Sequence, residues 1–104
     1  MKKIAFIVAA TFMAVSGATL AGGDAAAGKS KSAVCAGCHG SAGVSVGPLF
    51  PNLAGQKEGY IVKQLKAFKS GYRKDPIMTN MAKPLSDSDV ANLAAHFSGL
   101  PAGK

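Results

Sequence analysis

Apolar residues recur along this chain with the period of a helix, and no stretch alternates with the two-residue period of a strand. The clearest case is residues 58–70, where Ile61, Leu65 and Phe68 occupy positions i, i+4 and i+7 of one helix face. Gly71 follows directly and is a typical end signal. The pattern therefore predicts a helix over 58–70.

Two further helices are predicted near the ends of the chain. Asp24 can cap a helix over 25–34, because its carboxylate can accept hydrogen bonds from the free backbone N–H groups of a first turn. The sequence at 86–89 has the form of a capping box, and Gly99 marks the end of the helix that follows. The apolar stripe of this last helix consists of Val90, Leu93, Ala94 and Phe97.

The segments between these helices are rich in glycine and proline. Residues 40–55 and 72–85 each contain two prolines, so we expect two long, ordered loops. Loops of that length in so small a domain usually wrap a ligand. The predicted fold class is all-α, with three to four short helices joined by long loops.

The first 21 residues have the three parts of a secretory signal peptide: a basic start, an apolar run over 4–15 and a small, neutral end. The apolar run is well short of the ~20 residues that span a bilayer. We expect cleavage after Ala21, or alternatively after Ala18. A single domain over 22–104 would then work outside the cytoplasm, with no membrane span.

Composition indicates that this domain needs help to fold. The chain has 104 residues, no Trp and only 7% aromatic residues, so its own side chains supply a thin core. Chains of this size usually add a disulfide, a metal or a cofactor. The two cysteines are the first candidates for forming a disulfide or holding a metal or cofactor.

A net charge of +7 points to acidic partners or anionic surfaces. Seven cations lie between residues 57 and 83, which we call the basic cluster, and they include three on the 58–70 helix. A solvated helix face explains such a cluster as well as a docking surface for acidic redox partners does. Basic and aromatic residues are not interleaved in the way that would indicate binding to nucleic acid. The basic cluster consists of Lys57, Lys63, Lys66, Lys69, Arg73, Lys74 and Lys83.

Residues 35–39 read Cys-Ala-Gly-Cys-His, the C-x-x-C-H pattern of covalent haem c attachment. The spacing suits the chemistry: Cys35 and Cys38 can each add to one vinyl group of a haem, and His39 is then held against the iron. A buried porphyrin would also supply the missing core. The sequence therefore predicts one covalently bound haem c with its iron.

Other uses of two cysteines fit less well. A plain Cys35–Cys38 disulfide is compatible with export. A thioredoxin-like pair needs a βαβ context, which this pattern lacks. A structural zinc site needs about four ligands, and beyond the signal peptide the chain offers two cysteines and two histidines without paired spacing.

The iron then needs a sixth ligand or an open position. Beyond the signal peptide the candidates are Met78, Met81 and His96. Both methionines lie in the second predicted loop, from which a thioether can reach the haem face opposite His39. His96 lies beside the apolar stripe of the last helix and is expected to be a flanking surface residue.

These motifs resemble those of the class I c-type cytochromes, especially the short cytochrome c-553 type and one half of the di-haem cytochromes c4. The resemblance covers nearly all of residues 24–100. Its strongest segments are Cys35–His39, Phe50–Gln56, Tyr60–Leu65, Ile77-Met78 and the stretch from Leu85 to Ala95. It implies the small cytochrome c fold around one haem.

The resemblance also implies roles for single residues. Met78 matches the family's sulfur ligand, with Met81 in reserve, and the carbonyl of Pro51 matches the acceptor of the second imidazole N–H, with Pro48 as a competing choice. Leu53 would pack on the haem, and Gly28 would allow the first and last helices to cross closely. Weaker candidates for haem contacts are Tyr60, Gln56 and Arg73.

The implied function is a soluble periplasmic electron carrier rather than an enzyme, and a monomer is compatible with it. Its partners would be a quinol-oxidising complex and a terminal oxidase or reductase. Two alternatives stay open: a haem subunit of a dehydrogenase, and a small haem enzyme or gas sensor with an open sixth position.

Overall fold

The computed structural model describes residues 22–103, and these contain helices but no strand, as predicted. The proposed signal peptide over 1–21 lies outside the described residues. Within them, no helix is long and apolar enough to cross a bilayer. The helices in chain order are α2 (Ala25–Lys31), the 3₁₀ helix η1 (Ser32–Cys35), α3 (Ala36–His39), α4 (Glu58–Ser70), α5 (Met78–Ala82) and α6 (Asp87–Ser98).

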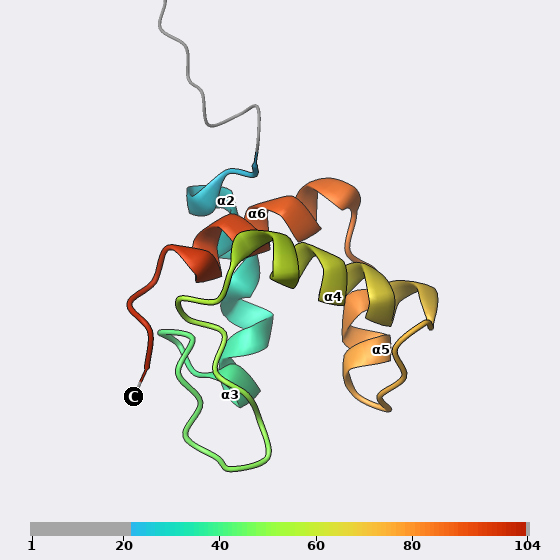
Figure 1. Ribbon diagram of the computed structural model, residues 1–104, viewed down its shortest axis with the longest axis horizontal. Helices are drawn as coiled ribbons and strands as arrows, with labels where there is room; N and C mark the ends of the chain where they lie inside the picture. Colours follow the sequence, from blue (N-terminus) through green and yellow to red (C-terminus); the bar gives the residue numbers. More distant parts are fainter. Residues whose placement is uncertain (1–21, 104) are drawn as a thin grey trace, which may run out of the picture.

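The first and last described helices, α2 and α6, pack against each other although they lie far apart in the sequence (Figure 1). A Cβ atom built on Gly28 would lie 1.9 Å from the carbonyl oxygen of Asn92. Only glycine therefore permits this approach, as the family resemblance implies. The Asp24 N–H donates to Oδ1 of Asn92 at 2.7 Å, and Lys31 Nζ lies 3.5 Å from a carboxylate oxygen of Asp89.

Both predicted helix caps are present. The Asp24 carboxylate accepts the N–H groups of Ala26 and Ala27. At α6 the Ser86 hydroxyl accepts the Asp89 N–H, and the Asp89 carboxylate accepts the Ser86 N–H, both at 3.0 Å. These bonds satisfy backbone donors that a first helical turn leaves free.

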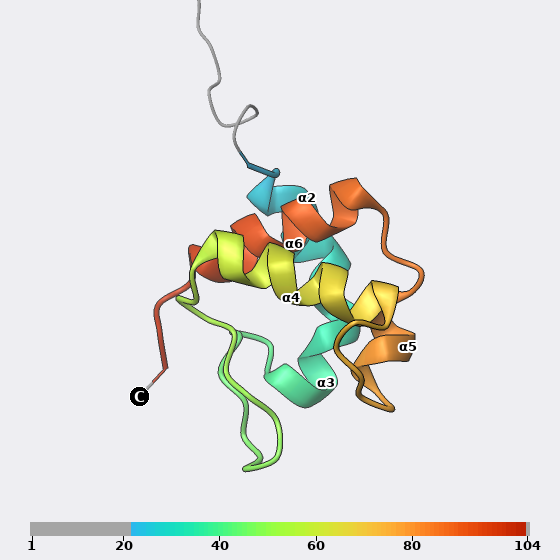
Figure 2. The same ribbon diagram turned by 45° about the vertical axis from the view of Figure 1, so that its right-hand side comes forward.

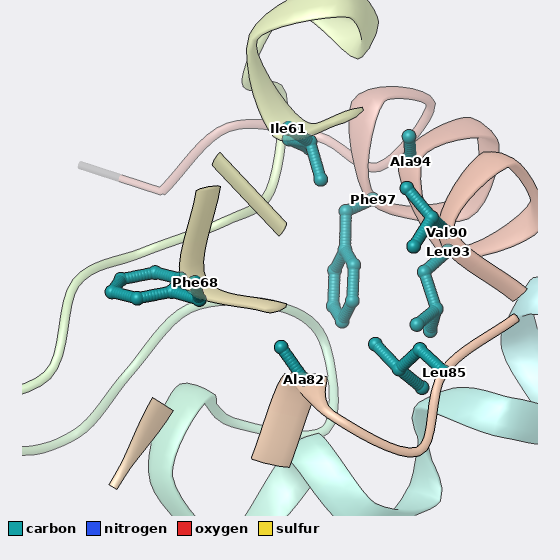
Figure 3. Close-up of a cluster of buried hydrophobic side chains, with 8 residues drawn as sticks. All are labelled: Ile61, Phe68, Ala82, Leu85, Val90, Leu93, Ala94 and Phe97. Atoms are coloured by element: carbon teal, nitrogen blue, oxygen red, sulfur yellow. The ribbon is translucent and has the colours of Figure 1, made fainter. Parts of the chain in front are cut away.

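The hydrophobic core lies between α4, α5 and α6 (Figure 3). The predicted apolar face of α4 supplies Ile61 and Phe68, and α4 ends at Gly71, which takes a φ of 85°. The Phe97 ring extends from α6 toward Ala82 of α5. The buried members are Ile61, Phe68, Ala82, Leu85, Val90, Leu93, Ala94 and Phe97.

Two of the predicted boundaries were wrong. The first helix does not stop at residue 34, because η1 and α3 continue the helical path to His39. The segment 72–85 is not all loop, because it contains α5. Both α3 and α5 lie on the same side of α4 in the two views (Figures 1 and 2), which places the C-x-x-C-H segment and the two methionines on that side.

Candidate haem site

His39 is the last residue of α3, and its side chain is 7% exposed. Its Nδ1 lies 2.8 Å from the carbonyl oxygen of Pro51. Since a carbonyl oxygen only accepts, the neutral imidazole must carry its proton on Nδ1. The lone pair of Nε2 then remains for a metal, and the hydrogen bond fixes the plane of the ring.

The chain reverses after α3 to bring Pro51 to this position. Gly40 makes the reversal possible: its φ is 87°, and a Cβ there would lie 2.0 Å from the carbonyl oxygen of Val44. The Gly43 carbonyl then accepts the N–H groups of Leu53 and Ala54 at 2.8 and 3.0 Å. The competing residue, Pro48, is exposed in the same loop, and the bond from His39 goes to Pro51.

Cys35 ends η1 and Cys38 lies in α3, and both are half-buried free thiols. A separation of three residues on a helical path places both side chains on one face. Cys35 also packs against the core. Burial raises the pKa of the Cys35 thiol, and the neighbouring Cys38 raises it further.

The alternatives to haem attachment find no support among residues 22–103. Neither cysteine forms a disulfide there. No group of three or more His, Cys, Asp or Glu side chains gathers in this part of the chain as a metal site would require.

The two methionines lie one helical turn apart but differ in their surroundings. Met78 is the first residue of α5, is partly buried and packs against the core. Met81 is 40% exposed. The structure therefore places one thioether at the core and leaves the other in contact with solvent.

His96 is not the surface residue that the sequence predicts. Its side chain is 8% exposed, and its ring centroid lies 4.9 Å from that of Phe97. α2 covers it, since a Cβ on Gly28 would come within 2.9 Å of His96 Cβ. Burial lowers the pKa of His96, and the charge of Lys29 lowers it further.

The weaker candidates do not gather around one point. Leu53 is partly buried and packs against the core, whereas Tyr60 is half-exposed in the first turn of α4. Arg73 lies beyond the other end of α4. This helix has 13 residues and is about 20 Å long, so it separates Arg73 from Tyr60. The guanidinium carbon of Arg73 lies 4.6 Å from the centroid of the Phe68 ring, and its Nη1 donates to Gln64 at 2.7 Å.

Gln56 is exposed, and its side-chain oxygen accepts the Lys57 N–H at 2.9 Å. This bond joins neighbouring residues and gives Gln56 a local role in the loop before α4.

Asp75 makes contacts that the sequence analysis missed. Its carboxylate accepts the N–H groups of Ile77 and Met78 at 2.9 and 2.8 Å, and these bonds lower its pKa. The sequence does carry a signal: an Asp followed by Pro is a frequent start for a short helix, because the Asp caps it and the Pro fits its first position.

The donor set fits a c-type haem. Two free thiols lie on one helical path, and the next residue is a buried imidazole whose Nδ1 proton is already engaged. A thioether packs against the same core that Cys35 touches. Thiols are the groups that attach haem covalently, and imidazole nitrogen and thioether sulfur are established axial ligands of haem iron.

Comparison with known proteins supports a c-type haem. A family model described as Cytochrome c matches residues 25–101. Cytochrome c4 from Pseudomonas aeruginosa is 48% identical over 86 residues, covering 83% of this chain and 43% of that protein. Cytochrome c-554(548) from Halomonas halodenitrificans is 46% identical over 79 residues, covering 73% of this chain and 95% of that protein.

A solved structure shows the same architecture. The crystal structure of reduced recombinant cytochrome c4 from Pseudomonas stutzeri aligns with a TM-score of 0.73 at 48% identity, covering 76% of this chain and 46% of that one. The chain thus spans about half the length of the cytochrome c4 relatives that it matches. With this family match and a C-x-x-C-H segment in place, the chain belongs to the cytochrome c family, whose haem c is bound covalently.

Proposed function

We propose that this protein is a periplasmic electron carrier whose haem iron is held between His39 and Met78. The observation that carries the proposal is the bond from His39 Nδ1 to the Pro51 carbonyl, because it leaves Nε2 as the ligating atom. Met78 supports it as the methionine that packs against the core. When bound, the haem supplies a one-electron couple between ferric and ferrous iron.

The chain's own part is to keep two ligands fixed in both oxidation states. His39 is held by Pro51, and the Met78 side chain packs against the core, so little of the chain would rearrange when an electron arrives or leaves. A thioether ligand also raises the reduction potential. If His39 and Met78 both held the iron, no position would remain for oxygen, peroxide or a substrate, which favours a carrier over an enzyme.

Export to the bacterial periplasm is the second element of the proposal. The signal-like pattern over residues 1–21 supports it, and two thioethers keep a cofactor attached in a compartment where a lost haem is not recovered. Detection of the mature chain, beginning at Gly22, in a periplasmic fraction would test it. A chain that keeps Met1 in the membrane fraction would contradict it.

Acidic surfaces on redox proteins are the proposed partners, with a quinol-oxidising complex as donor and a terminal oxidase or reductase as acceptor. All seven side chains of the basic cluster are exposed. Lys63, Lys66 and Arg73 line a shallow groove of about 590 Å³ along α4 and the turn after it. Positive charge gathered on one helix speeds the encounter with an acidic partner more than it tightens the complex.

Optical spectra of the oxidised and reduced protein test the ligation. We expect a c-type reduced spectrum and a near-infrared sulfur-to-iron band that is lost in Met78→Ala and kept in Met81→Ala. A protein without haem bands after expression with haem-attachment machinery would overturn the assignment. A high-spin spectrum that binds carbon monoxide at once would instead favour a haem enzyme or gas sensor.

A further inference from the structure

Helix α5, which carries Met78, has five residues, and a helix of that length is not stable by itself. Its position must therefore come from contacts with the rest of the chain. Ala82 is fully buried in the core near its end, and beyond this end the Lys69 ammonium donates to the carbonyl of Leu85. Met78 lies at the opposite end, where its side chain packs against the core, but the contacts of Ala82 and Lys69 do not hold its backbone.

At that end, Asp75 makes four hydrogen bonds with the first turn. Its carboxylate oxygen Oδ1 accepts the N–H groups of Ile77 and Met78 at 2.9 and 2.8 Å. Its backbone carbonyl accepts the Thr79 N–H at 3.0 Å, and its own N–H donates to Thr79 Oγ1 at 3.0 Å. The backbone on both sides of Met78 is thus tied to one residue.

This arrangement is that of a helix cap placed before the first regular residue of α5. The carboxylate accepts from the second and third residues after it, as an N-cap side chain does. Pro76 occupies the first position, where its fixed φ fits and its missing N–H costs nothing. Removing the carboxylate would free two backbone N–H groups and loosen the turn from which the thioether extends.

We propose that Asp75 is the positioning residue for the sixth ligand: its carboxylate holds the backbone of Met78 so that the thioether stays on the iron. This inference rests on the proposed ligation by Met78. Asp75 acts only through the backbone N–H groups of residues 77 and 78. Loss of the carboxylate raises the fraction of protein in which the sixth position is open.

Titration of the ferric holoprotein with imidazole measures that fraction, because imidazole binds only where the thioether has left, and its affinity rises in proportion. We expect Asp75→Ala to bind imidazole about fivefold more tightly than the unsubstituted protein, the effect of one lost cap. The near-infrared sulfur-to-iron band should disappear at correspondingly lower imidazole concentration. Asp75→Asn keeps the accepting oxygen and should stay within about twofold.

Asp24→Ala is the matched control. Asp24 caps α2 with the same two kinds of bond, to Ala26 and Ala27, so its loss lowers the stability of the fold without touching α5. We expect its imidazole affinity to remain that of the unsubstituted protein. Thr79→Val offers a milder second variant, since it removes only the acceptor of the Asp75 N–H, and should shift the affinity in the same direction.

Three outcomes separate the inference from the ligation itself. If Asp75→Ala and Thr79→Val bind imidazole like Asp24→Ala while Met78→Ala loses the sulfur band, Met78 is the ligand and the role of Asp75 is overturned. If Asp75→Asn behaves like Asp75→Ala, the accepting oxygen is not what positions Met78, and the inference is also overturned. If the sulfur band persists in Met78→Ala, the proposed ligation fails, and the role of Asp75 fails with it.

Discussion

The imidazole of His39 and the carbonyl of Pro51 are twelve residues apart in the sequence and 2.8 Å apart in space. The acceptor is a backbone atom, so no substitution at position 51 removes it. What proline contributes is a fixed φ in the residue that carries the carbonyl. The relationship therefore depends on the path of the loop more than on the identity of one side chain.

Pro51→Ala should accordingly weaken the hydrogen bond without deleting it. We expect faster exchange of the His39 Nδ1 proton with solvent, measured by NMR, together with a stability loss of about 0.4–1 kcal/mol from the freer unfolded chain. Pro48→Ala is the control, because it loosens the same loop at an exposed position. Equal exchange rates in the two variants would show that Pro51 does not fix this carbonyl.

Gly28→Ala should destabilise the protein by about 1–3 kcal/mol, because the added methyl group meets the backbone of α6 and forces the helices apart. The new Cβ would lie 1.9 Å from the carbonyl oxygen of Asn92. Gly59→Ala is the comparison, since nothing lies within 4 Å of a Cβ there, and it should stabilise α4 by about 0.5–1 kcal/mol. Urea unfolding of both variants measures the difference, and a Gly28→Ala protein as stable as the original would refute the close crossing.

The pH dependence of stability should include a contribution from His96. Burial and Lys29 lower its pKa in the folded protein, so between the unfolded value of about 6.5 and the lower folded value the unfolded chain binds more protons. Stability is therefore intact above this range and falls as the pH drops through it. His96→Gln should be less sensitive to a change from pH 7.5 to pH 5 in urea unfolding.

The comparison of the two proteins isolates His96, because they differ only at this residue. The pKa values of Asp75 and Asp89 are lowered from an ordinary value of 3.8. These two carboxylates therefore change the stability only at a lower pH than His96 does. Identical pH profiles for the original protein and His96→Gln would mean that the His96 site accepts a proton without cost.

The basic cluster should govern the rate of encounter with charged oxidants. Replacing Lys63 and Lys66 by Ala removes two positive charges from the groove on α4. We expect oxidation by ferricyanide to slow about threefold to tenfold at low salt, and oxidation by a cationic cobalt complex to accelerate. In stopped-flow measurements, the rates of the variant and of the original protein should converge as the ionic strength rises. Lys29→Ala, on α2, is the control and should change the rates less.

The regular elements could be predicted where local patterns decide them. The face of Ile61, Leu65 and Phe68 and the capping box at Ser86 are short-range features, so the bounds of α4 and the start of α6 followed from the sequence. The segment of α5 did not, because Pro76 and Pro84 look like loop residues. In the structure they flank the helix, and Pro76 fits its first turn.

His96 shows a different reason for failure. Its place beside the apolar stripe of α6 indicates a surface position only if α6 has one buried face. α2 covers a second face, and the signal for that lies in another element, at Gly28. Cys35, Cys38 and His39 could be proposed as haem donors from the sequence alone, because their spacing is dictated by the cofactor and not by the packing of distant helices.

The crossing of α2 and α6 also determines when this chain can finish folding. A ribosome releases α2 first and α6 last, so the contact between Gly28 and Asn92 forms only after nearly the whole domain has emerged. Until then the C-x-x-C-H segment, which follows α2 directly, has no closed structure around it. Closure of the fold around Cys35 and Cys38 therefore requires the last helix, α6.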